Sequence, residues 1–150
     1  MQIQLGDISH IIQLAIAPVF LLTGVGTKLM VLTNRLARII DRSRVLEDRL
    51  HMGEATDQLA YHQELDTLYF RSHLINRAIT LSTACGLFVC LVIGALFVGD
   101  ALNLELGKLI ASLFVLAMLS LIGSFAYLLR EIFVATASLS IRRVPRRDSQ

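Results

Sequence analysis

The sequence predicts an all-α membrane protein with three transmembrane helices and a cytoplasmic antiparallel helical hairpin that joins spans one and two. Three observations support this prediction. The 150-residue chain is 55% hydrophobic, and its 17% of charged residues are clustered, which is typical of membrane proteins rather than soluble ones. It contains three long apolar runs, and the segment between the first two repeats its apolar residues in heptads. We therefore expect a single membrane domain over residues 1–150.

Three apolar runs are long enough to cross a bilayer, which needs about 20 mostly apolar helical residues. They cover residues 8–32, 78–98 and 109–129, and the last two contain no charged residue. Pro18 lies inside the first run, where a transmembrane helix tolerates proline. The residues before the first run lack the basic start of a cleavable signal peptide, so none is expected.

The distribution of Lys and Arg predicts the orientation. Segment 34–77 carries seven Arg and the tail 130–150 carries five, whereas the amino-terminal residues have none and the 99–108 connection has only Lys108. Basic segments remain in the cytoplasm. The sequence therefore predicts an external amino terminus and a cytoplasmic tail, with the third helix continuing through residues 132–141 along the inner surface.

The 34–77 segment shows two heptad seams, which predict a helical hairpin. Gly53 is a plausible end for the first helix and Thr56 a plausible N-cap for the second. When the segment is folded between these residues, the apolar positions of the two arms meet in pairs whose residue numbers always sum to 111. The pairs are Leu32–Ile79, Leu36–Ile75, Ile39–Ser72, Ser43–Leu68, Leu46–Leu65 and Leu50–Tyr61. We expect a hairpin about 30 Å long that continues from spans one and two.

Span one and its extension carry a stripe of polar, small and basic residues along one side. Lipid does not require such a stripe, so it is expected to face protein or water. Its members are Gln13, Ala17, Phe20, Gly24, Lys28, Arg35, Arg38 and Arg42. One interpretation is a pore lining with Phe20 as a hydrophobic constriction. The other is an interhelical hydrogen bond for Gln13 and a Lys28 side chain that reaches the headgroups.

Small residues in spans two and three predict close helix packing. They are Gly86, Cys90, Gly94, Ser120 and Ser124. The packing is either within one subunit or between subunits, and the sequence leaves both open. The two cysteines, Cys85 and Cys90, point to different sides of a helix and are read as packing residues.

Few residues suggest chemistry. No phosphate loop, Cys-x-x-Cys or His-Glu-x-x-His motif occurs, so we expect no enzyme, cofactor, structural metal or nucleic-acid partner. Asp7 and His10 share a face at the outer end of span one, either as a surface pair or as a cation site. With Asp100 and Glu105 they would form the acidic outer mouth of a pore.

Several segments together resemble bacterial membrane proteins of domain-of-unknown-function family 2721. The segments are Ile16-Ala17-Pro18, Leu32 to Arg38, Arg71 to Ala78, and Arg130-Glu131. The resemblance covers nearly the whole chain and implies a small multi-pass protein of the bacterial inner membrane with this three-span layout. It implies no activity and assigns no site residue.

Two functions from different classes remain. One is a homo-oligomeric ion-conducting pore, assembled through span one and the hairpin within membrane lipid. Three spans enclose no channel, so a ring of subunits is required. The other is a membrane-anchored scaffold or sensor whose hairpin binds a cytoplasmic protein. A transporter is a weaker third option, because the spans show no pair of interrupted helices.

Overall fold

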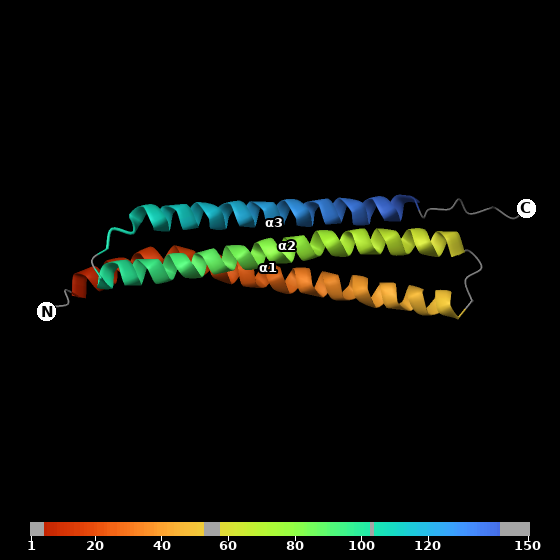
Figure 1. The fold of residues 1–150 in the computed structure, drawn as a ribbon, viewed down its shortest axis with the longest axis horizontal. Helices are drawn as coiled ribbons and strands as arrows, with labels where there is room; N and C mark the ends of the chain where they lie inside the picture. The colour runs from red at the N-terminus through yellow and green to blue at the C-terminus, as the bar shows by residue number, and fades with distance from the viewer. Residues whose placement is uncertain (1–4, 53–57, 103, 142–150) are drawn as a thin grey trace, which may run out of the picture.

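The computed structural model describes residues 5–52, 58–102 and 104–141, and these residues form three long helices. They are α1 (Leu5–His51), α2 (Gln58–Ala101) and α3 (Gly107–Ile141). The helices lie side by side along their length, with α2 between α1 and α3 (Figure 1). The start of α1, the end of α2 and the start of α3 share one end of the molecule. The all-helical prediction is confirmed for the described residues.

All three helices contain a stretch long and apolar enough to cross a membrane. The stretches lie within Ser9–His51, Tyr61–Ala101 and Gly107–Thr136, in agreement with the three predicted spans. Because large side chains such as Leu87, Leu119 and Ile122 are more than half exposed on these helices, an apolar environment must cover them. The chain is therefore a multi-pass membrane protein.

Helix α1 is continuous from its apolar half into its charged half. It passes through Pro18 and through the polar junction after Leu32 without a break, as the sequence predicts. The predicted stop at Gly53 and N-cap at Thr56 fall outside the described residues. The measured bounds, His51 for the end of α1 and Gln58 for the start of α2, lie on either side of them.

The charged halves of α1 and α2 pack against each other through the two heptad seams. Apolar residues of both arms form one cluster, so the two seams do meet. The buried members are Leu32, Ile39, Leu46, Leu65, Leu68, Ile75 and Ala78, with Leu36, Leu50, Tyr61 and Ile79 partly buried around them. Each side chain in such a seam is removed from water by its partner helix, and this burial holds the arms together.

The same seam continues into the apolar halves. Ile11, Pro18 and Val25 are buried at intervals of seven residues, in phase with Leu32, Ile39 and Leu46. Opposite them, a Cβ placed on Gly86 would lie 3.8 Å from Val25, and these two residue numbers again sum to 111. One heptad register therefore aligns α1 and α2 from Val25 to Leu50.

Helix α3 packs on a different side of α2. The buried residues of α2 there recur every seven positions at Ala78, Cys85, Val92 and Gly99. They are matched on α3 by Ala117, Ser124 and Glu131, which also recur every seven residues and are fully buried. Small residues at most of these positions let the two helices approach closely.

The predicted packing set is only partly used within the chain. Gly86 faces α1 and Ser124 faces α2, whereas Cys90 and Gly94 are exposed and Ser120 is half-buried. A Cβ on Gly94 would meet nothing within 4 Å. The sequence left open whether these residues pack within one subunit or between subunits, and the close contact of α2 with α3 instead includes Ala78 and Cys85.

The end of α3 keeps the direction of the helix. The predicted continuation through residues 132–141 is helical, and this part runs beside the charged half of α2 rather than turning along a surface (Figure 1). Tyr127 and Leu128 of α3 also pack against the cluster formed by α1 and α2. The third helix therefore supports the base of the hairpin.

Candidate functional site

A buried carboxylate joins all three helices where their apolar halves end. Glu131 of α3 is fully buried, and each of its oxygens binds a different arginine. Oε2 accepts a hydrogen bond from Arg35 of α1. Oε1 accepts two from Arg71 of α2, from Nε at 3.1 Å and Nη2 at 2.8 Å. Both bonds from Arg71 converge on one carboxylate oxygen, and all three bonds to Glu131 are charge-assisted.

The electrostatics of this ion triad are unequal. Glu131 has no exposed surface, whereas the side chains of Arg35 and Arg71 remain 33% and 22% exposed. The carboxylate is therefore fully desolvated, and its charge is stabilised by the two arginines. Each arginine side chain is only partly desolvated. The triad carries a net charge of +1 at the junction between apolar and charged halves.

Sequence reasoning missed the triad. It assigned Arg35 to the stripe on span one and gave Glu131 no partner. A signal was present, because Glu131 is the only carboxylate between residues 106 and 147 and follows an uncharged run of 21 residues. Such an isolated acid at the basic end of a bundle is expected to pair with a neighbouring helix.

A second polar cluster surrounds Lys28 within the apolar halves. The Lys28 amine lies 2.9 Å from the Ser124 hydroxyl oxygen and 3.5 Å from the centre of the Phe125 ring. Ser124 donates its proton to the Ala78 carbonyl at 2.6 Å, so its oxygen accepts from both Lys28 and Ser82, which lies 2.8 Å away. One hydroxyl thus satisfies polar groups from all three helices.

The Lys28–Ser124 and Arg35–Glu131 contacts lie in one row along α1 and α3. Lys28 and Arg35 are seven residues apart on α1, and their partners Ser124 and Glu131 are seven apart on α3. Seven residues are two helical turns, or about 10 Å. Because α1 and α3 run in the same direction, the row connects them twice at matching heights, although each packs on α2.

The predicted pore stripe is divided by this arrangement. Lys28 is buried, Arg35 pairs with Glu131, and Arg42 donates two hydrogen bonds to Glu64 of α2, at 3.0 and 2.9 Å. The other members stay exposed. They are Gln13, Ala17, Phe20, Gly24 and Arg38.

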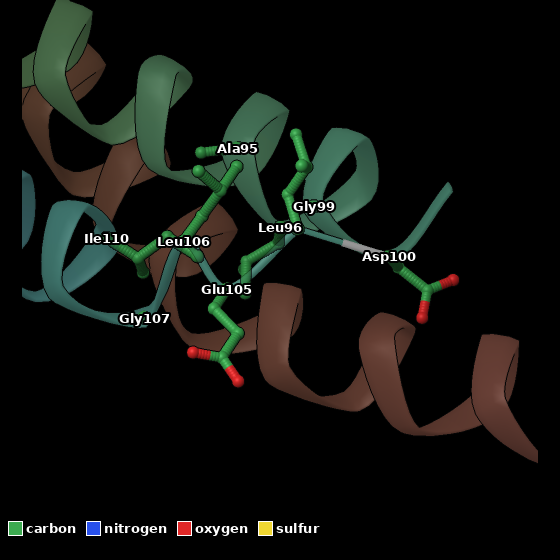
Figure 2. A pocket seen from close by; sticks show the side chains of 9 residues that line it. Ala95, Leu96, Gly99, Asp100, Glu105, Leu106, Gly107 and Ile110 are labelled. Atoms are coloured by element: carbon green, nitrogen blue, oxygen red, sulfur yellow. The ribbon is translucent and has the colours of Figure 1, made fainter. Parts of the chain in front are cut away.

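The structure describes the side chains of three of the four residues predicted for an outer mouth. The Asp7 side chain lies outside the described residues, and His10 is exposed. Asp100 and Glu105 border a pocket of about 390 Å³ at the α2–α3 connection, where Leu106 and Ile110 supply apolar walls. Their carboxylates point away from each other (Figure 2). No group of three potential metal ligands occurs among the described residues.

Comparison with known proteins gives one match. A family model described as a protein of unknown function, DUF2721, covers residues 15–141, which include Lys28, Arg35, Arg71 and Glu131. No curated protein and no solved structure matches the chain. Because the matched region is most of the sequence, the chain belongs to the DUF2721 family of proteins of unknown function.

Proposed function

We propose that the protein is the subunit of a homo-oligomeric pore lined by the uncovered side of α1. The observation that carries this proposal is the exposed polar and small surface of a membrane helix. Gln13 and Gly24 lie on it, and no other helix covers either residue in the part of the chain that the structure describes. An exposed amide inside a bilayer is costly and is stabilised by water or another protein surface. A ring of subunits supplies both.

Fewer residues remain available to line the pore than the sequence suggested. It keeps Gln13, Ala17, Phe20 and Gly24 in the span, with Arg38 at the inner end. Lys28 and Arg35 instead hold α1 to α3. Phe20, 74% exposed, is the bulkiest member of this lining and forms its hydrophobic constriction.

Ion flux through reconstituted liposomes tests the pore. Phe20→Ala widens the constriction and is expected to raise the flux several-fold. Phe97→Ala is the matched control, because Phe97 is also exposed in a span but lies on α2. If the purified oligomer is intact and neither the wild type nor Phe20→Ala conducts, the pore proposal is wrong.

A second function, a scaffold, is favoured by the polar contacts that connect the charged halves of α1 and α2. Beyond the apolar halves, α1 and α2 are cross-connected by the Arg42–Glu64 ion pair and by the Tyr69 hydroxyl, which donates to Glu47. Glu131 ties the base of this hairpin to α3. A rigid arm of this kind, placed in the cytoplasm, suits presentation of a binding surface.

Crosslinking in cells followed by mass spectrometry tests the scaffold. A single partner that crosslinks to wild type but not to an Asp48→Lys/Asp66→Lys variant supports it, because both carboxylates are exposed on the arm. Asp100→Lys, at the opposite end of the molecule, is the control and should keep the partner. Equal crosslinking in all three proteins contradicts a docking role for the arm.

A further inference from the structure

The arginines at the base of the hairpin fall into two groups. Arg35, Arg42 and Arg71 are engaged in ion pairs within the chain. Arg77 of α2 and Arg130 of α3 are exposed, and no ion pair to either is found in the part of the chain that the structure describes. The neighbouring acid, Glu131, is fully used by the first group. The second group is therefore available to an external anion.

Arg77 and Arg130 are held in place by aromatic rings in a crossed arrangement. Arg77 lies 6.0 Å from the ring centre of Tyr127 on α3, and its Nη1 donates to the Tyr127 hydroxyl at 3.5 Å. Arg130 lies 5.7 Å from the ring centre of Phe70 on α2. Each guanidinium thus rests on a ring from the other helix, which restrains it while leaving N–H groups free.

The position of this pair along the helices indicates which anion it meets. Arg77 directly precedes the apolar run 78–98, and Arg130 directly follows the run 109–129. Both are at the same end of their spans, at the height where the phosphates of a bilayer leaflet lie. Guanidinium groups bind phosphate through two parallel hydrogen bonds.

We propose that the Arg77–Arg130 pair, with Tyr127 and Phe70, is a binding site for the headgroup of an anionic phospholipid. The two guanidiniums bind the phosphate, and the acyl chains lie along the exposed apolar surface of the spans of α2 and α3, which includes Ile122 and Leu129 in span three. The site is separate from the exposed α1 surface, so it does not depend on a pore.

Native mass spectrometry of the detergent-solubilised protein tests the site. Phosphatidylglycerol should bind the wild type, and the Arg77→Gln/Arg130→Gln variant should bind it on the order of 30-fold more weakly, because each arginine near a charged lipid surface contributes about fivefold. Phosphatidylcholine with the same acyl chains should show no such difference between the two proteins.

Two controls make the result specific. Arg44→Gln/Arg49→Gln removes the same charge from exposed positions further along the hairpin and should leave binding unchanged. Arg77→Lys/Arg130→Lys keeps the charge but loses the planar fork, so intermediate binding is expected, and this variant substitutes if the Gln pair does not fold. Equal losses in both Gln pairs, no loss in either, or equal binding of inorganic phosphate at the same concentration would overturn the proposal.

Discussion

Arg35 of α1 forms an ion pair with Glu131 of α3, although both helices pack on α2 and not backbone to backbone with each other. Long side chains therefore make the direct polar connection between the first and third helices. Arg71 completes it from α2, so one carboxylate fixes the relative position of all three helices. These contacts fix α1 and α2 to α3 at the junction between the apolar and charged halves, so the two halves are expected to move together.

Glu131→Gln is expected to destabilise the protein. An amide cannot neutralise two guanidiniums, and one side of it offers a donor where Arg35 or Arg71 needs an acceptor. Breaking a buried ion pair by removing one partner costs about 3–5 kcal/mol, and the partial exposure of both arginines favours the lower end. Thermal unfolding in detergent should show a melting temperature lower by about 6–12 °C.

Glu105→Gln is the control for this change, because Glu105 is an exposed carboxylate on the connection before α3. Its melting temperature should stay within about 1 °C of the wild type, as is usual for surface substitutions. A Glu131→Gln protein as stable as Glu105→Gln would mean that the triad contributes nothing to holding the helices together.

Ser124→Ala is expected to cost more stability than any other serine substitution in spans two and three. It leaves the Lys28 amine, the Ser82 hydroxyl and the Ala78 carbonyl without the partner they share. Leaving buried polar groups unsatisfied costs about 1–3 kcal/mol. Urea or thermal unfolding should rank the variants Ser124→Ala, then Ser82→Ala, then half-buried Ser120→Ala. A flat ranking would contradict the network.

The sequence predicted most of the fold because the fold follows from periodicity. Apolar length set the spans, and heptad spacing set the pairing of α1 with α2, down to the cluster of Leu32, Ile39 and Leu46 with Leu65 and Ile75. The position of α3 against α2 was not predictable from periodicity. Its contact with α2 includes Ala78 and Cys85, and small residues spaced by seven do not stand out in a run where every residue is apolar or small.

The polar contacts were less predictable than the helices. Lys28 and Arg35 share a stripe with Gln13 and Phe20 on an ideal helix, which suggested one common surface. In the structure the buried side of α1 follows a heptad and drifts relative to an ideal helix, so that Lys28 and Arg35 turn toward the neighbouring helices while Gln13 and Phe20 stay exposed. The residue pattern of one helix does not show which neighbouring helix its polar residues contact.

The register of α1 against α2 predicts which cysteine pairs can be crosslinked. In a background with Cys85 and Cys90 replaced by Ala, Leu46→Cys/Leu65→Cys should react rapidly with a short thiol-specific crosslinker, because the register that places Gly86 beside Val25 also places Leu65 beside Leu46. Leu46→Cys/Ile75→Cys is the control, since ten residues displace the second thiol by about 15 Å along the helix. Equal yields for the two pairs would show that the register slips or differs.

Orientation in the membrane is the last prediction, and it depends on the distribution of Arg rather than on any contact. The end of the molecule with Glu105 carries few basic residues, and the end with Asp48 lies beyond the arginines of the hairpin base. In the same cysteine-free background, Glu105→Cys should react with a membrane-impermeant maleimide in intact cells, whereas Asp48→Cys should react only after permeabilisation. Both side chains are exposed, so burial cannot produce the difference. The opposite labelling pattern would place the hairpin outside the cell, and with it Arg77 and Arg130 would face the outer leaflet.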